Sequence, residues 1–484
     1  MRFSPILSVL GFIILATGVA ELTALPISIY YGESDFSAIL ISSAVAILAG
    51  LILFYGFRQA QSEPIRAREG FAGVALSWIA ASTFGSLPYI LSGVLPHFTD
   101  AFFETISGFS TTGASVIADV ESIPHGILYW RALSNWMGGM GIIVLSLAII
   151  PLLGIGGMQL FKAEVSGPAK DKLTPRVIET ARILWIVYLV VTVAEAVLLM
   201  LGGMNMFDAV CHSFSTIATG GFSTKNASIG FFNSVYTEVV VIVFMFIGSC
   251  NFSLLYLGLR SGIREYFKDD EFVFYLLSYL AALVFVTLIV AAGSKGGDFF
   301  MSLRASAFSV MTVFSTTGFA TADFALWPAA AQTLLLLLMI LGACAGSTGG
   351  GLKQVRVLLL LKTAFNEFRK MIHPKLVLPV RINGAAVDQE TLVTIAGFLI
   401  LYLAALFNSS VILMLTGLPP LEALSAVAAC LTNEGPGLGA VGPMGNYVHL
   451  SVIAKWVLST CMLLGRLELF TVLALLSGAF WRNK

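Results

Sequence analysis

The stretch FSTTG, Phe109 to Gly113, occurs a second time as Phe314 to Gly318. Between the two copies lies a related stretch, FSTIATGGFST, from Phe214 to Thr224. Short segments of hydroxyl side chains and glycine are unusual in an apolar chain, because their backbone N–H and C=O groups need partners away from water. The repeated segments therefore require a fold that gives these backbone groups partners inside an apolar protein.

The composition identifies the class of protein. The chain has 484 residues, of which 57% are hydrophobic and 11% charged, whereas a soluble protein has roughly 25% charged residues. Apolar runs of about 20 residues, enough to cross a bilayer, recur along its length. Backbone in lipid must be hydrogen-bonded within its own segment, which favours helices. We therefore predict an all-α integral membrane protein, in which the five cysteines, without CxxC spacing, are small buried hydrophobic residues.

Ten apolar runs are predicted to be full crossings, which places both termini on one side. Most of the 27 Lys and Arg residues fall in the loops of that side, and the opposite loops are richer in acids. By the positive-inside rule the basic face, with both termini, is predicted to be cytoplasmic. The predicted runs are 5–30, 37–56, 71–93, 127–150, 183–203, 234–258, 272–293, 329–352, 391–416 and 450–480.

Four of the connections between runs share one internal order, which indicates a repeated architecture. Each begins with an amphipathic helical piece: AFFETISGF, MFDAVCHSF, LRASAFSVMTVF or LEALSAVAACL. Each continues with a polar loop: STTGAS, IATGGFST, STTGFAT or TNEGPGLG. The glycines interpreted as equivalent are Gly113, Gly220, Gly318 and Gly435.

The predicted fold is therefore four pseudo-repeated helix–pore-loop–helix units around a central pore, preceded by two extra N-terminal transmembrane helices. The predicted divisions are 1–60 for the extra helices and 61–165, 166–262, 263–385 and 386–484 for the four units.

The repeated loop has the chemistry of a cation site. Irregular backbone at membrane depth is tolerated only where protein or a water-filled path shields it, and glycine permits positive φ. Carbonyl oxygens that face the axis could replace the hydration shell of a cation. One such loop alone would be interpreted as a helix cap, but four copies predict a selectivity filter. The predicted filter residues are Ser110, Thr111, Thr112, Gly113, Ile217, Ala218, Thr219, Gly220, Ser315, Thr316, Thr317, Gly318, Thr432, Asn433, Glu434 and Gly435.

These loops and three longer stretches resemble the bacterial Trk/Ktr/HKT superfamily of potassium transporters, and within it the TrkH-like membrane subunits. The resemblance covers essentially the full length, and the two extra spans favour the TrkH-like type over the shorter KtrB type. The fourth loop departs from the others, with Asn433-Glu434 where two loops have Thr-Thr, and the role of the Glu434 side chain stays open. The longer stretches run from Asn135 to Glu164, from Gly342 to Arg356 and from Leu464 to Thr471.

The resemblance implies K⁺ uptake across the bacterial inner membrane through a gated, channel-like pore with a glycine in each filter segment. It also implies a homodimer and a separate TrkA-like cytoplasmic subunit that binds NAD and ATP or ADP, with no cofactor in this chain. The basic loops 162–182 and 353–381 are candidate docking surfaces, or they reflect topology alone.

Three alternatives stay open. One is a family member with weaker K⁺/Na⁺ discrimination, or with K⁺ symport coupled to H⁺ or Na⁺. Another is alternating access, although such carriers usually contain inverted repeats and these units run in one orientation. The third is an intramembrane serine protease, because GFST occurs at Gly108 and Gly221. Catalysis needs one serine with one base, so repetition disfavours an enzyme.

The stretch GSTGGG, Gly346 to Gly351, is a candidate gate. Each glycine in a helix costs about 1 kcal/mol relative to alanine, so the segment predicts a break in the helix. It is no phosphate loop, because Leu352 separates it from Lys353. The alternatives are a packing kink and a gate below the filter, which the resemblance favours. The predicted gate residues are Gly346, Ser347, Thr348, Gly349, Gly350, Gly351 and Arg466.

Arg466 stands within the last span, where a charge is costly. It is interpreted either as a structurally paired arginine or as a barrier to cations that the gate relieves. At the outer side, five acids are expected to concentrate cations at the pore mouth. These acids are Asp100, Glu104, Asp119, Glu121 and Asp323.

Overall fold

The computed structural model describes residues 2–57, 67–149, 173–293, 298–374, 378–467 and 469–477. The described part is helical except for one antiparallel hairpin, in which β1 (Arg381–Ile382) pairs with β2 (Ala385–Ala386). The predicted all-α fold is confirmed. The predicted divisions near residues 60 and 165 lie outside the described residues, as do several predicted cytoplasmic cations: Arg58, Arg66, Lys162, Lys170, Lys172, Lys375, Arg482 and Lys484.

Six helical runs in the described residues are long and apolar enough to cross a membrane, and a bent helix pair is a seventh candidate. The bent pair is α11 (Val235–Ser249) and α12 (Phe252–Ser261), which meet at 104°. The predicted straight crossing 234–258 is therefore wrong, because Asn251 starts a new helix by accepting hydrogen bonds from the amides of Ser253 and Leu254. The six runs are Ser4–Tyr31, Phe36–Gly56, Arg68–Leu91, Glu179–Leu201, Asp270–Gly293 and Gln389–Leu415.

The predicted crossing 329–352 is also interrupted. Its helix, α15 (Ala329–Leu341), ends at Gly342, which has a φ of 71°. The chain then runs without regular structure to Lys353 and resumes as α16 (Gln354–Ile372). The glycines of this stretch produce the break that their number predicted.

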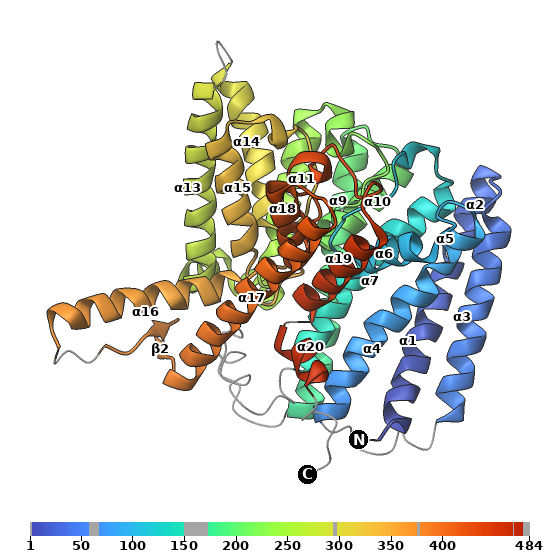
Figure 1. Cartoon of the computed structure of the whole chain (residues 1–484), viewed down its shortest axis with the longest axis horizontal. Coiled ribbons are helices and arrows are strands. Elements are labelled where there is room, and N and C mark those ends of the chain that lie inside the picture. The colour runs from blue at the N-terminus through green and yellow to red at the C-terminus, as the bar shows by residue number, and fades with distance from the viewer. Residues whose placement is uncertain are drawn as a thin grey trace.

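The extra N-terminal helices form a closely packed pair. α1 (Ser4–Leu22) lies along α3 (Phe36–Gly56), and α2 (Leu25–Tyr31) connects them at the outer end. A β-carbon at Gly11, Gly18 or Gly50 would collide with the opposite helix, so small residues allow the two backbones to approach. α1 also packs on the first unit, and the pair stands at one side of the molecule (Figure 1).

The remaining helices form four units, each with a half-helix between membrane-spanning helices. The half-helix α6 contains 12 residues, which at 1.5 Å per residue is about 18 Å, or roughly half of a bilayer core. The first unit contains α4 (Ala67–Gly85), α5 (Leu87–Leu91), α6 (Phe98–Phe109) and α7 (His125–Ile149). The second contains α9 (Leu173–Leu201), α10 (Met206–Ile217), α11 and α12. The third contains α13 (Asp270–Gly293), α14 (Phe299–Phe314), α15 and α16. The fourth contains α17 (Gln389–Leu415), α18 (Pro420–Thr432), α19 (Val452–Arg466) and α20 (Leu469–Leu476).

The four units close into a ring. Each half-helix packs against the helix that follows the half-helix of the preceding unit: α10 against α7, α14 against α11, α18 against α15, and α6 against α19. The last of these contacts joins the fourth unit to the first. A closed cycle of this kind brings the C-terminal ends of the four half-helices to one axis.

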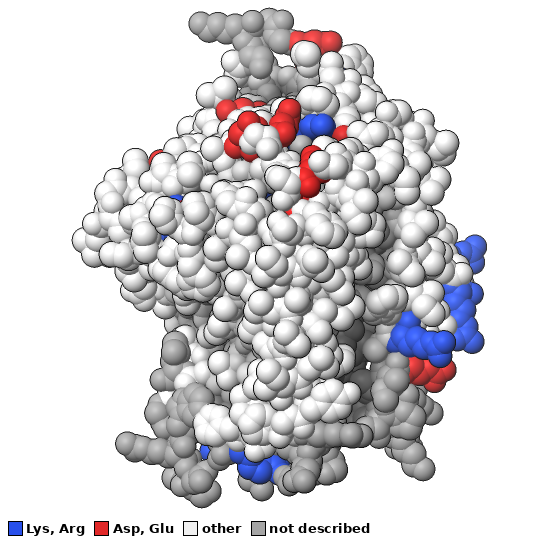
Figure 2. All heavy atoms as spheres, turned by 90° about the vertical axis from the view of Figure 1, so that its right-hand side faces the viewer, with Lys and Arg blue, Asp and Glu red and all other residues white. Residues whose placement is uncertain are grey.

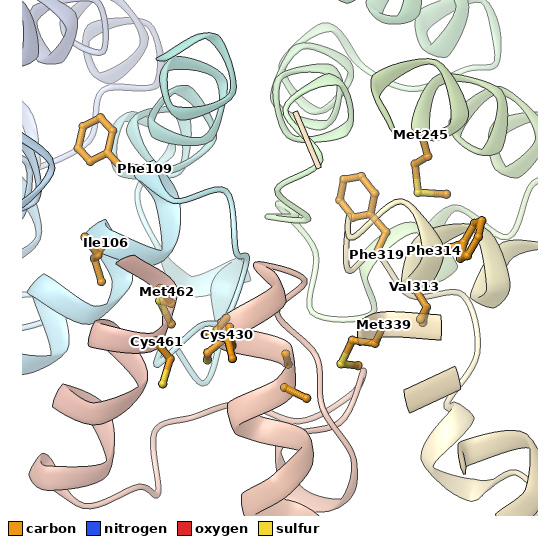
Figure 3. Packing of buried hydrophobic residues seen from close by; sticks show 14 of the residues in the cluster. Ile106, Phe109, Met245, Val313, Phe314, Phe319, Met339, Cys430, Cys461 and Met462 are labelled. Carbon is orange, nitrogen blue, oxygen red and sulfur yellow. The ribbon is translucent and has the colours of Figure 1, made fainter. Parts of the chain in front are cut away.

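Apolar side chains fill the space around this axis. Figure 3 shows Phe109 and Ile106 of α6 on one side and Met462 of α19 close by, with Phe314 and Met339 across the ring. On the face drawn in Figure 2, most acidic side chains gather near the upper end and most basic ones in the lower half. The five cysteines are buried and unpaired by disulfides, as predicted.

Candidate functional site

The four half-helices end in the same backbone conformation. The second residue after α6, α10 and α14, and the first after α18, has a positive φ: 54° at Thr111, 53° at Thr219, 57° at Thr316 and 57° at Asn433. Two residues later a glycine again has a positive φ, and these glycines are Gly113, Gly221, Gly318 and Gly435. A side chain is strained in this region of φ, which explains why glycine occupies the second position in every loop.

The second loop differs from its predicted register by one residue. The amide of Thr112 donates to the carbonyl of Ser107 at 2.8 Å, and the amide of Gly220 donates to the carbonyl of Ser215 at 2.7 Å. Gly220 is therefore equivalent to Thr112. The equivalence assigned from the sequence to Gly220 is wrong, because Gly221 takes the conformation of Gly113. The second loop aligned by structure is Ala218, Thr219, Gly220 and Gly221, with Ile217 as the last residue of α10.

The four glycines contact the loops beside them in a closed cycle. A β-carbon at Gly113 would collide with the carbonyl oxygen of Gly220. The same holds for Gly221 against the Thr317 carbonyl, Gly318 against the Glu434 carbonyl and Gly435 against the Thr112 carbonyl. Each loop is thus packed, backbone to backbone, on the next. At these four α-carbons the neighbouring carbonyl leaves no space for any side chain, so only glycine fits.

The carbonyl oxygens of this ring are free to bind a ligand. Within the described residues, no hydrogen bond is donated to the carbonyls of Thr112, Gly220, Thr317 or Glu434. Because buried carbonyls normally have partners, four unpaired oxygens at one axis form a site that suits a dehydrated cation. The C-terminal ends of four half-helices add partial negative charge there.

Hydroxyl side chains of the loops act mainly as braces. The Ser110 and Thr112 hydroxyl oxygens lie 2.7 Å apart, and those of Ser315 and Thr317 lie 2.8 Å apart. In the fourth loop, the Asn433 amide nitrogen donates to the Thr112 hydroxyl at 3.0 Å and to the Met462 carbonyl at 2.9 Å. The asparagine that departs from the Thr-Thr pattern therefore joins the fourth loop to the first.

Glu434 contributes its carbonyl to the ring, but its carboxylate is fully buried. Neither carboxylate oxygen accepts a hydrogen bond from the residues that the structure describes.

Ion pairs support the outer side of the loops, and sequence reasoning misplaced them. Glu104 is fully buried and accepts from Arg131 Nε at 2.7 Å and from the Val116 amide at 2.9 Å. Arg131 also donates to the Ser223 carbonyl at 3.0 Å. The expectation of a free acid at the mouth is therefore wrong for Glu104, which joins the first loop to the second.

The other four acids also have protein partners. Asp100 pairs with Lys455 at 2.7 Å. Asp119 and Glu121 both accept hydrogen bonds from Asn226 of the second unit, and the Asn226 side chain lowers the pKa of the exposed Asp119 carboxyl. Asp323 accepts from the amide of Ala325. These acids tie loops together in addition to placing charge at the outer end.

The glycine-rich segment lies directly against three of the loops. The Thr348 hydroxyl lies 2.9 Å from the carbonyls of both Ile217 and Gly248. The Gly350 amide donates to the Thr316 hydroxyl at 2.8 Å. A β-carbon at Gly350 would collide with the Thr432 carbonyl. We refer to residues 342–353 as the crossing segment, since it touches the second, third and fourth loops.

Arg466 holds the crossing segment from the opposite side. It is 3% exposed, and its guanidinium donates to the Thr348 carbonyl at 2.7 Å and to the Gly138 carbonyl at 2.8 Å. The two predicted gate elements, the GSTGGG stretch and Arg466, are therefore in direct contact. Both roles considered from the sequence agree with this position, because the arginine is bonded to the backbone and lies next to the ring.

A carboxylate that sequence reasoning missed joins the crossing segment to the first turn of α16. Glu271 of α13 accepts from the Ala345 amide at 2.7 Å and from the Val355 amide at 3.0 Å. Lys353 has a φ of 74° and donates to the Gly349 carbonyl. The only sequence signal for Glu271 is an acid at the start of an apolar span, which is also the pattern of an ordinary interfacial residue.

Comparisons with known proteins identify relatives over the full length of the chain. The family model named TrkH, described as a cation transport protein, matches residues 36–483. The chain is 40% identical over the full length of both chains to the Trk system potassium uptake protein TrkH of Halomonas elongata, and 40% identical to that of Escherichia coli. The crystal structure of the potassium transporter TrkH from Vibrio parahaemolyticus matches with a TM-score of 0.92, 37% identity and full coverage of both chains.

Proposed function

Since the chain belongs to the TrkH family of cation transport proteins, we propose that it takes up K⁺ as the membrane subunit of a Trk system. The single observation that carries this proposal is the closed ring of glycines and unpaired carbonyls. A cation that leaves water needs oxygen ligands in its place. Four backbone carbonyls at one axis supply them without a fixed charge, which would hold the ion too tightly for passage.

The ring then acts as the selectivity filter. Its geometry is set by backbone contacts between loops, so the distance between facing carbonyls cannot adapt easily to a smaller ion. The residues that form it are Thr111 to Gly113, Thr219 to Gly221, Thr316 to Gly318 and Asn433 to Gly435, with Ser110, Ala218, Ser315 and Thr432 at the ends of the half-helices.

The crossing segment is the gate. It lies beneath the ring and is held by side-chain hydrogen bonds from Thr348, Arg466 and Glu271. Release of these bonds would free the segment without disturbing the ring. The Arg466 guanidinium adds repulsion, which at close approach is on the order of a few kcal/mol for an effective dielectric constant of about 20.

The basic face is proposed to be cytoplasmic, in a bacterial inner membrane, with both termini on that side. A TrkA-like nucleotide-binding subunit docks there, and two copies of the chain form a homodimer. Support for these statements comes from family membership and from the charge distribution in Figure 2.

Uptake of radioactive rubidium into liposomes that contain the purified protein tests the proposal. External K⁺ is expected to compete, and Na⁺ and Li⁺ to compete much less. Gly318→Ser should abolish this difference, because its side chain would collide with the Glu434 carbonyl. Gly397→Ser is the matched control, since nothing lies within 4 Å of the added carbon. Equal competition by all three ions in the unaltered protein would contradict a K⁺ filter.

A further inference from the structure

The helix that follows the crossing segment has an exposed apolar face beside a row of cations. Four apolar residues of α16 are 45% to 66% exposed and recur at helical spacing: Leu361, Phe365, Phe368 and Ile372. Lys362 and Arg369 lie one helix position away from this stripe. In Figure 1, α16 extends sideways from the lower end of α13. Such a helix is typical of the membrane interface.

A groove of about 510 Å³ lies between α16, the beginning of α13 and the residues that lead into β1. Phe274, Leu361 and Phe365 give it an apolar wall. Lys362, Arg369 and Arg381 place three cations around it. The groove therefore combines the two chemistries that a lipid presents, an acyl chain and a charged headgroup.

Two of these cations have no carboxylate partner among the residues that the structure describes. Lys362 pairs with Asp270 at 2.8 Å, and the neighbouring Lys370 pairs with Glu367 at 2.6 Å. Across the described ranges, no carboxylate lies within ion-pair distance of Arg369 or Arg381. Within that part of the chain, two guanidinium groups beside the groove remain without a carboxylate, as a site for an anion requires.

We propose that this groove binds an anionic phospholipid of the cytoplasmic leaflet. Arg369 and Arg381 hold the phosphate, and Leu361 and Phe365 line the acyl chains. Guanidinium groups match phosphate oxygens in a bidentate fork. Anionic lipids are concentrated in the cytoplasmic leaflet, and basic pockets between helices at that level bind their headgroups. The apolar wall distinguishes this ligand from free phosphate.

The bound lipid acts on the crossing segment through α16. The Gln354 amide donates to the Ala343 carbonyl at 3.0 Å, and its side chain donates to the Gly342 carbonyl at 2.6 Å. The first residue of α16 is therefore bonded to the start of the segment. A lipid that holds α16 against α13 holds this junction in place.

Native mass spectrometry of the purified full-length protein tests the site, with phosphatidylglycerol and phosphatidylcholine of identical acyl chains as probes. Arg369→Gln with Arg381→Gln should lower phosphatidylglycerol affinity by about twenty-five-fold, the product of two contacts worth about fivefold each. Arg260→Gln with Arg264→Gln removes the same charge outside the groove and should change affinity less than threefold, since surface attraction alone is weak. Phe365→Ser should weaken binding of both lipids, and its neighbour Phe368→Ser should not, because Phe368 does not line the groove.

Several results would overturn the lipid site. Equal affinity for the two lipids would show that the headgroup charge is not recognised. Equal losses of phosphatidylglycerol affinity in both double arginine variants would show nonspecific electrostatic attraction to the protein surface. Binding of glycerol phosphate as tight as that of phosphatidylglycerol would identify a phosphate site without acyl chains. A dimer that Phe365→Ser converts to monomer, with phosphatidylglycerol affinity unchanged, would identify a protein interface. Because the readout is a mass, failure here leaves the rubidium test of K⁺ uptake untouched.

Discussion

The ring of four loops and the crossing segment beneath it are both rich in glycine, but they are held in different ways. In the ring, glycine α-carbons contact the carbonyls of the next loop, so backbone fixes backbone. In the crossing segment, side chains of Thr348, Arg466 and Glu271 hold the backbone through individual hydrogen bonds. Contacts of the first kind cannot be released singly, whereas those of the second kind can. The ring is therefore suited to discrimination between ions, and the crossing segment is suited to movement during gating.

The largest effect is expected at the second loop, where two adjacent glycines can be compared. Gly221→Ala places a β-carbon against the Thr317 carbonyl at a φ of 69°. The displaced carbonyl should lower K⁺/Na⁺ discrimination by tenfold or more, which corresponds to a change of about 1.4 kcal/mol in the difference between the K⁺ and Na⁺ barriers. Gly220→Ala meets the Asn135 side chain, which can move, and should cost less. Rubidium uptake with K⁺ and Na⁺ competition measures both. A larger loss of discrimination in Gly220→Ala than in Gly221→Ala would support the equivalence of Gly220 with Gly113 that was predicted from the sequence.

A change at Glu271 should affect flux and leave discrimination intact. Glu271→Ala removes the acceptor of two buried amides, and each unpaired group costs about 1–3 kcal/mol. The crossing segment should then open more often and resting rubidium flux should rise about tenfold. Glu271→Gln, which keeps an acceptor oxygen for both amides, is the control and should lie closer to the unaltered protein. Lost discrimination at normal flux would place Glu271 in the filter instead.

Arg466→Gln should raise the resting leak by about fivefold, corresponding to roughly 1 kcal/mol of barrier. The substitution removes the positive charge beside the ring and weakens the bond to the Thr348 carbonyl. Rubidium flux must be divided by the amount of folded protein, because a structural role would lower stability. Arg264→Gln, exposed on the surface, is the control. A fall in flux by correctly folded Arg466→Gln would contradict the barrier role.

The smallest effect is expected from the bracing hydroxyls. Ser110→Ala and Ser315→Ala each delete a short hydroxyl–hydroxyl hydrogen bond and a longer one to a carbonyl of the half-helix, a loss of about 1 kcal/mol in stability. Discrimination should change less than threefold, because the carbonyl ring is held by backbone contacts. Thermal unfolding and ion competition separate the two quantities. A tenfold loss of discrimination with unchanged unfolding would make these hydroxyls ion ligands.

Much of this arrangement could be predicted from local patterns. The repeat of amphipathic piece and polar loop is a property of contiguous residues, and the structure confirms the four units that it indicated. The break at Gly346 to Gly351 followed from helix propensity, although the helix ends earlier, at Leu341. For these features the cause lay within about ten neighbouring residues. The break at Asn251 also has a local cause, the N-cap of α12, but the apolar run around it hid that signal.

The other errors arose where the cause was distant in sequence. Whether Gly220 or Gly221 takes the positive φ depends on the Thr317 carbonyl of another unit. Glu104 looks like a surface acid until Arg131 of the following span is placed beside it. Glu271 receives its two partners from residues more than 70 positions away. Such pairings depend on the closed ring of helices, which no local pattern contains.

That ring belongs to a single polypeptide. In a pore built from identical subunits every substitution arrives in all quadrants at once, and most changes at the axis are then too severe to survive. Here each quadrant is encoded separately, so one can drift while the other three preserve function. The fourth quadrant carries Asn433-Glu434 where two others carry Thr-Thr, and Asn433 is bonded to the first loop. In this architecture a single mutation accordingly changes one of the four loops and leaves the other three as they were.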